Sequence, residues 1–198
     1  LILLSGEKIY QLSQKIMHHI PEIVAPGGSH NKAIIAAKYW ADVIYLGVPF
    51  TSLRMRQNKI QTFDTLQKTI DEIHALGKKA YLTMNIFPRN QDIHIFEQVV
   101  EQVAKLWSDG IIFSDPGTYR TIRKYMPDIP LHLSTQASTL NYEAVRLRYD
   151  VGTRRVVLAR ELHIDEISEI NKNVPEMELE VFLHAAMCMS YSCRCLLG

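Results

Sequence analysis

Three cysteines lie close together near the end of the sequence. Cys188, Cys193 and Cys195 are the only cysteines among the 198 residues, and they follow a C-x4-C-x-C spacing. Thiolate is the ligand that soft metals and iron–sulfur clusters prefer, so clustered thiols indicate a metal or redox site. A cysteine can also be a small buried hydrophobic residue or a lone reactive thiol, and spacing alone leaves these interpretations open.

The stretch before the cysteines alternates acidic and apolar residues, as ELEVFL at residues 178–183. This alternation is typical of a half-buried strand and predicts that the strand delivers the cysteines to its carboxyl end. His184 would then lie beside the thiols. It is either a structural histidine or a base for Cys188.

Polar residues also follow the other predicted strands. Because the carboxyl ends of parallel strands share one edge, these residues are expected to meet at one rim, where an active site for a small polar substrate would form. The candidates are Gly27, Gly28, Ser29, Asn85, Asp115, Gln136, Arg160, Glu161 and His184.

Each candidate also has a structural interpretation. The Gly-Gly-Ser sequence at residues 27–29 offers backbone N–H groups to an anion or cofactor, or it forms a plain strand-to-helix turn with a serine cap. Arg160 binds a carboxylate or phosphate with two nitrogens, or forms structural ion pairs together with Glu161. Asp115 precedes Pro116 and is either a turn residue or a catalytic acid.

Short apolar runs alternate with helical patterns along the chain, which predicts a parallel sheet with right-handed crossovers. Ser29 and Thr62 are placed as helix caps, and Gly77 as the end of a helix. A closed barrel needs eight strands, so we predict an α/β fold, an incomplete (β/α) TIM-like barrel with seven βα units, with an open doubly wound sheet as the alternative. The strands are expected at residues 22–25, 43–46, 79–84, 111–114, 131–133, 155–159 and 178–184.

Composition limits the function classes. With 47% hydrophobic residues and no apolar run long enough for a membrane span, the chain is expected to be a soluble, cytoplasmic protein with one domain. A formal charge of +1 makes no global electrostatic case for nucleic-acid binding. Neither the H-E-x-x-H helix of zinc peptidases nor the G-x-S-x-G nucleophile elbow occurs in the sequence.

Several stretches together resemble the collagenase-like peptidase U32 family. They are PEIVAPGGS (21–29), VIYLG (43–47), SDPG (114–117), LSTQA (133–137), RVVLAREL (155–162) and HAAMCMSYSCRCLL (184–197). The resemblance covers residues 21–198 in the right order and implies a barrel domain there that is truncated at its C-terminus. The helical spacing of apolar residues before it predicts a separate leading helix at residues 1–20.

The resemblance implies two different activities. The family is named for peptidase and collagenase activity, whereas its bacterial branch most similar to this sequence is associated with prephenate-dependent 5-hydroxylation of the wobble uridine of tRNA. Related proteins carry a [4Fe–4S] cluster, and Cys188 and Cys195 match the first two cluster cysteines, the others lying downstream of Gly198. The chain departs from the family pattern at Ala185, Cys193 and Gly198; Cys193 is a substitute metal ligand or a chance replacement of glycine.

We therefore expect a tRNA-hydroxylating enzyme first, with an iron–sulfur centre on the cysteines. A small carboxylate donor, which the resemblance identifies as prephenate, would be oriented by Arg160 and Asn85, and a subunit of a related family is a possible partner. A metal- or thiol-dependent peptidase is the second hypothesis. An inactive or binding remnant is the third.

Overall fold

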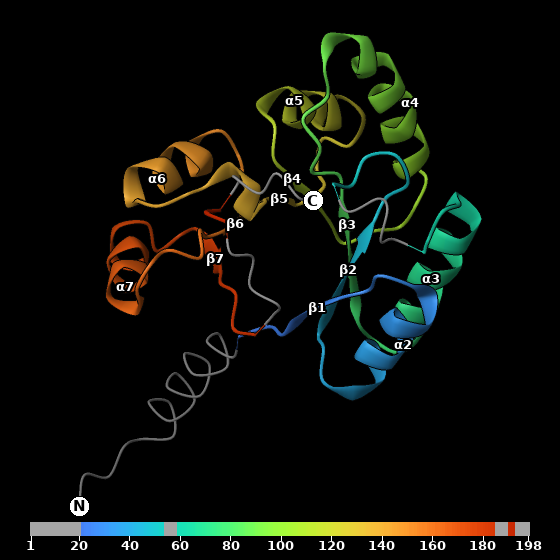
Figure 1. Ribbon diagram of the computed structural model, residues 1–198, viewed down its shortest axis with the longest axis horizontal. Coiled ribbons are helices and arrows are strands. Elements are labelled where there is room, and N and C mark those ends of the chain that lie inside the picture. Colours follow the sequence, from blue (N-terminus) through green and yellow to red (C-terminus); the bar gives the residue numbers. More distant parts are fainter. Residues whose placement is uncertain (1–20, 54–58, 185–189, 193–198) are drawn as a thin grey trace, which may run out of the picture.

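A computed structural model describes residues 21–53, 59–184 and 190–192 of the chain. It forms a curved sheet whose strands lie at the centre, with helices around the outside (Figure 1). The helix predicted at residues 1–20 lies outside the described residues. Among the described residues, none of the helices has the length and apolar character needed to cross a bilayer.

Seven strands form one parallel sheet in the order β1-β2-β3-β4-β5-β6-β7, so each strand pairs with the next one along the chain. A doubly wound sheet reverses its strand order at a switch point, and this sheet does not. The prediction of a half-barrel with seven parallel strands is thus confirmed. The strands are β1 (Val24–Pro26), β2 (Val43–Gly47), β3 (Lys79–Thr83), β4 (Gly110–Phe113), β5 (Leu131–Leu133), β6 (Arg155–Val157) and β7 (Glu178–Glu180).

Four of the α-helices begin at side chains that accept hydrogen bonds from the first turn. Ser29, Thr62, Asp115 and Asn141 each accept a hydrogen bond from a backbone N–H of the helix that follows, which satisfies a donor without an intrahelical partner. Gly77 has a φ of +70° and ends its helix in the left-handed region. The α-helices are α2 (His30–Tyr39), α3 (Phe63–Ala75), α4 (Ile93–Val103), α5 (Pro116–Tyr125), α6 (Tyr142–Asp150) and α7 (Ile164–Asn173), with short 3-10 helices η2 (Asn90–Asp92) and η3 (Thr135–Ala137).

The two faces of the sheet differ in chemistry. The outer face carries residues such as Leu82, Ile111 and Val156, which join one large apolar core with the helices. The inner face has a much smaller apolar cluster, centred on Val43, Tyr81 and Ile112. Inward positions on the later strands are polar or charged, which is the first sign that the inside of the barrel has a role beyond packing.

A contact between distant strands shows how strongly the sheet curves. Arg155 on β6 donates a hydrogen bond of 2.7 Å to Glu22, which lies just before β1. In a flat sheet these strands would be separated by about 24 Å, five steps of about 4.8 Å. The sheet therefore curls around an axis and brings its two edges towards each other.

The seventh strand is shorter than predicted. It ends at Glu180, so His184 lies beyond the strand, and the three cysteines lie outside the described residues. The alternation was interpreted correctly, because Leu179 packs against the outer core. The acidic residues Glu178 and Glu180 point to the other face and lie against Arg155 inside the barrel. Only residues 178–180 pair with β6.

Candidate functional site

The turn after β1 is packed tightly and uses its own polar groups. The Gly27 N–H donates to the Tyr45 carbonyl at 2.9 Å, and a Cβ at Gly27 would lie only 2.5 Å from Leu46 Cδ2. Ser29 Oγ accepts from the Lys32 N–H at 3.3 Å as the cap of α2. These are the contacts of a strand-to-helix turn, and binding of a cofactor by residues 27–29 stays a prediction.

Asp115 and Asn85 also make local contacts. Asp115 Oδ1 accepts from the Thr118 N–H at 2.9 Å and so begins α5, which is the turn interpretation of this residue. Asn85 Oδ1 accepts from the Leu53 N–H at 3.2 Å, which leaves the side-chain amide nitrogen as its donor group. Catalytic roles for both residues stay predictions.

Gln136 lies on η3, directly after β5. Its backbone N–H donates to Ser134 Oγ at 3.3 Å, which secures the turn at this end of the strand. Gln136 is partly exposed and belongs to the same rim as Asn85 and Asp115. A catalytic role for Gln136 stays a prediction.

Arg160 and Glu161 hold a segment that is distant in sequence. The Arg160 backbone N–H and Nε donate to Ser192 Oγ at 3.2 and 3.3 Å, and Nη2 donates to the Ser190 carbonyl at 2.8 Å. Glu161 Oε1 accepts from the Ser192 N–H at 2.7 Å. We call these four residues the β6 clamp: Arg160, Glu161, Ser190 and Ser192.

The β6 clamp locates the cysteine segment. Ser190 and Ser192 lie between Cys188 and Cys193 in the sequence, and Ser192 is only 1% exposed. Burial raises the pKa of the Glu161 carboxyl, but the hydrogen bonds from the Ser192 N–H and hydroxyl outweigh it, so the pKa lies below its ordinary value. A charged Glu161 therefore holds the chain between two cysteines beside the end of β6.

No described part of the chain gathers three or more His, Cys, Asp or Glu side chains in a way that could hold a metal ion. His184 is exposed and follows β7 by a few residues. The proposed ligands Cys188, Cys193 and Cys195 lie outside the described residues. Their role as ligands stays a prediction.

The inner face of the sheet carries an ionic network that the sequence analysis missed. Arg155, whose side chain is 11% exposed, donates to Glu178 from Nε and Nη2 at 3.0 and 2.8 Å and to Glu22 from Nη2 at 2.7 Å. Lys79 Nζ lies 2.5 Å from Glu22 Oε1, and Glu180 lies 3.6 Å from Arg155 Nη1. The only sequence signal was the acidic residue at every second position of β7.

The network shifts the pKa values of its members. Burial raises the pKa of Glu22, but the hydrogen bonds from Lys79 and Arg155 together lower it by more. The pKa of Glu22 therefore lies below its ordinary value. Burial alone outweighs the attraction of Arg155 at Glu180, whose pKa is raised. His132 is 2% exposed, and burial with the nearby positive charge of Arg155 lowers its pKa to about 3, so it is neutral at physiological pH.

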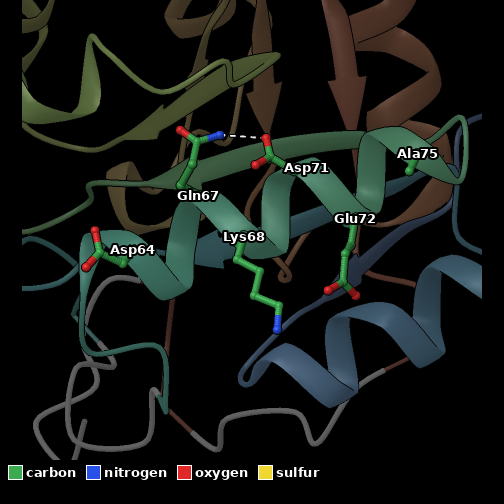
Figure 2. A pocket seen from close by; sticks show the side chains of 6 residues that line it. All are labelled: Asp64, Gln67, Lys68, Asp71, Glu72 and Ala75. Carbon is green, nitrogen blue, oxygen red and sulfur yellow. Dashed lines mark hydrogen bonds between the residues drawn. The ribbon is translucent and has the colours of Figure 1, made fainter.

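A hollow on the outer surface is a poor candidate site. It lies along α3, and the side chains of Asp64, Gln67, Lys68, Asp71, Glu72 and Ala75 line it, all from this one helix (Figure 2). Gln67 Nε2 donates to Asp71 Oδ1 at 2.7 Å across it. The lining groups are a helix's own polar face and do not converge from several elements, as an active site requires.

Comparisons with known proteins identify a family. The sequence model described as peptidase family U32 matches residues 28–198. The chain is 43% identical over 178 residues to tRNA hydroxylation protein P of Escherichia coli, which covers 90% of this chain and 39% of that protein. It thus spans about two-fifths of the length of that relative.

Two further relatives have other names. A collagenase of Porphyromonas gingivalis is 32% identical, with 89% of this chain and 44% of that protein covered. The 23S rRNA 5-hydroxycytidine C2501 synthase of Escherichia coli is 27% identical, with 91% and 27% covered. A solved structure of a U32 peptidase superposes with a TM-score of 0.67 at 15% identity, covering 82% of this chain and 68% of that one, which supports the barrel-type fold.

Proposed function

Because this chain belongs to peptidase family U32, we propose that it is part of an enzyme that hydroxylates RNA, acting on carbon 5 of the wobble uridine of tRNA. The observation that carries the proposal is the 43% identity to a tRNA hydroxylation protein over 90% of the chain. The name of the rRNA relative supports the same chemistry, since it describes hydroxylation of a pyrimidine at position 5.

We further propose that Cys188 and Cys195 ligate a [4Fe–4S] cluster, with Cys193 as a substitute ligand. Thiolates are the ligands that such clusters need, and a bound cluster would supply a redox or Lewis-acid centre. The β6 clamp supports this proposal, because it holds Ser190 and Ser192, between these cysteines, beside the carboxyl end of a barrel strand. Active sites of barrel enzymes lie at this end of the strands.

The hydroxyl donor that we propose is a small carboxylate, namely prephenate. Two of the rim residues have the chemistry to orient it: the Asn85 amide nitrogen is a hydrogen-bond donor, and Arg160 brings a positive charge. Arg160 also belongs to the β6 clamp, so a donor bound there would lie against the cysteine segment. The other proposed partners are tRNA and a subunit of a related family.

The test is nucleoside analysis of tRNA from a strain that lacks the gene. We expect hydroxyuridine derivatives to disappear and to return when the natural full-length gene is supplied. A Cys188→Ser variant should restore little or none, and its purified protein should contain less iron than the wild type. Unchanged hydroxyuridine in the deletion strain would refute the proposed function.

A collagenase-like peptidase is the second candidate, favoured by the 32% identity to the Porphyromonas gingivalis protein. His184 is exposed, and its relation to Cys188 lies outside the described residues. Cleavage of gelatin or casein by the purified full-length protein, lost in Cys188→Ala, would support this alternative. An inactive remnant is the third candidate; it would fold without metal, leave its thiols reactive and show no turnover.

A further inference from the structure

Two exposed phenylalanines follow neighbouring strands at the carboxyl rim of the sheet. Phe50 lies three residues after β2 and is 63% exposed, and Phe87 lies four residues after β3 and is 53% exposed. Active sites of barrel enzymes form from the loops at this rim. Both residues thus offer open apolar surface beside the candidate site.

The loops that carry the two phenylalanines are joined by hydrogen bonds. The Ile86 N–H donates to the Thr51 carbonyl at 3.3 Å, and the Leu53 N–H donates to Asn85 Oδ1 at 3.2 Å. The first of these bonds joins the direct sequence neighbours of the two phenylalanines. The exposed apolar residues therefore belong to one continuous surface of two adjoining loops.

Phe50 has a strained backbone. Its φ of +66° lies in the left-handed region, which bulky side chains rarely adopt. Val48 and Thr51, on either side of it, are buried, and the Val48 N–H donates to the Thr83 carbonyl at 3.2 Å. The loop is thus anchored while Phe50 is exposed, so packing of the ring offsets little of the strain. Strain of this kind is concentrated at functional sites.

Two cations flank the phenylalanines. Lys59 lies beside the turn after β1, where its N–H donates to the Gly28 carbonyl at 3.0 Å, and Arg89 follows Phe87 by two residues. Both are exposed, and neither side chain forms an ion pair within the described part of the chain. Asp92, the acidic residue nearest to Arg89 in the sequence, accepts from the Arg89 backbone N–H at 3.2 Å. The surface thus combines apolar rings with positive charge that these contacts leave unneutralised.

Rings interspersed with cations suit unpaired RNA. Bases stack on aromatic side chains whatever their sequence, while lysine and arginine bind the phosphates. A paired stem keeps its base faces inside the helix, so exposed rings contact the nucleotides of a loop or single strand. An apolar protein segment would bury the rings as well, but it would leave both cations without a partner.

We propose that Phe50 and Phe87 form a stacking platform for unpaired nucleotides of the RNA substrate, with Lys59 and Arg89 binding phosphates on either side. We call these four residues the aromatic rim. The inference rests on the proposed function, whose wobble uridine is an unpaired nucleotide, and adds the surface that holds the RNA loop. A loop bound there lies on the same rim as Asn85, which the first loop contact already includes.

The experiment measures how tightly the full-length protein binds two RNA probes. One is a stem–loop with an unpaired, uridine-containing loop, and the other is a fully paired duplex of the same stem. Phe50→Ala and Phe87→Ala should each weaken binding of the stem–loop about five- to thirtyfold, because the stacking of one base on a ring is lost. Binding of the duplex should change less than about twofold, since its bases stack on one another.

Tryptophan and leucine distinguish stacking from simple burial. Phe87→Trp retains an aromatic face and should bind the stem–loop within about twofold of wild type, whereas Phe87→Leu retains only apolar volume and should resemble Phe87→Ala. Trp107→Ala is the matched control: Trp107 is 82% exposed, but it precedes β4 at the opposite end of the barrel. Its affinity should equal that of the wild type.

Phe50→Gly uses the strained backbone as a second readout. Glycine adopts a positive φ without steric cost, so this variant should retain or gain thermal stability while it loses affinity for the stem–loop. Lys59→Met and Arg89→Met should each reduce the slope of log Kd against log salt concentration by about 0.7, the effect of one phosphate contact with a single strand.

Equal affinities of wild type, Phe50→Ala and Phe87→Ala for the stem–loop would overturn the inference. A lower Tm of Phe50→Gly with unchanged RNA binding would overturn it as well, because the ring would then pack against another part of the full-length protein. Equal weakening by Trp107→Ala would show an effect that does not depend on the rim and counts against it too. The proposed function is judged separately, by hydroxyuridine in the deletion strain.

Discussion

Two adjacent arginines bind the same glutamate from different environments, which allows a matched test of the ionic network. Arg155 Nη2 and Arg154 Nε lie 2.8 and 2.7 Å from Glu178. The Arg155 side chain is 11% exposed and also binds Glu22, whereas the Arg154 side chain is 61% exposed. Replacing each by methionine keeps the aliphatic stem and removes the charge.

The expected magnitudes differ because of burial. Removing one partner of a fully buried ion pair costs about 3–5 kcal/mol, since a charge is left buried without a partner. Glu22 and Glu178 are about one-third exposed, so we reduce the cost of Arg155→Met to about 2 kcal/mol. An exposed pair contributes about 0–1 kcal/mol, which is the expectation for Arg154→Met.

Thermal unfolding of the full-length variants at pH 7 is the assay. For a protein of this size about 1 kcal/mol shifts Tm by about 2–4 °C, so Arg155→Met should lower Tm by about 4–8 °C and Arg154→Met by less than about 4 °C. Equal shifts for the two variants would refute the reasoning, because burial would then not determine the strength of the network. A smaller shift for Arg155→Met would refute it as well.

Three further predictions concern other parts of the chain. Gly27→Ala should lower the free energy of unfolding by about 1–3 kcal/mol in urea denaturation, because the new Cβ would lie 2.5 Å from Leu46 Cδ2. Gly28→Ala is the control: a Cβ there has no atom within 4 Å, so the free energy of unfolding should change little. Ser192→Ala removes the hydroxyl that accepts two hydrogen bonds from Arg160, so Cys188 should react faster with maleimide in metal-free protein; an unchanged rate would show that the β6 clamp does not hold this segment. His132 has a pKa of about 3 in the folded protein and about 6.5 in the unfolded chain, so on acidification the unfolded chain binds the proton first. The free energy of unfolding should therefore fall by about 3 kcal/mol between pH 6.5 and pH 4. The His132→Gln variant should lose less over that range, and equal losses in the two proteins would contradict the assignment.

The elements were predictable because their signals are local. The helix caps at Ser29 and Thr62 and the left-handed Gly77 depend on neighbours within a few residues, and the structure confirms them. The number and direction of the strands followed from apolar runs alternating with helical patterns. The end of β7 could not be predicted, because apolar residues follow Glu180 up to Leu183 while the pairing with β6 does not continue.

The inner-face groups were missed because their partners are far away in the sequence. Arg155 binds Glu22, 133 residues before it, and no local pattern connects the two. Arg160 and Glu161 were recognised as rim residues, but a carboxylate site and a structural ion pair were the interpretations considered. Their contacts with Ser190 and Ser192 depend on how the chain returns to β6, which spacing does not reveal.

The β6 clamp lies at the same rim of the sheet as the end of β7, which places the cysteine segment among the strand ends. The Leu158 N–H donates to the Glu180 carbonyl at 2.9 Å, which pairs the end of β6 with the end of β7. Arg160 follows Leu158 by two residues, so the segment it holds reaches the same rim as Glu180. A cluster on Cys188 and Cys195 would therefore border this rim, and disrupting the clamp should impair hydroxylation of the RNA more than its binding.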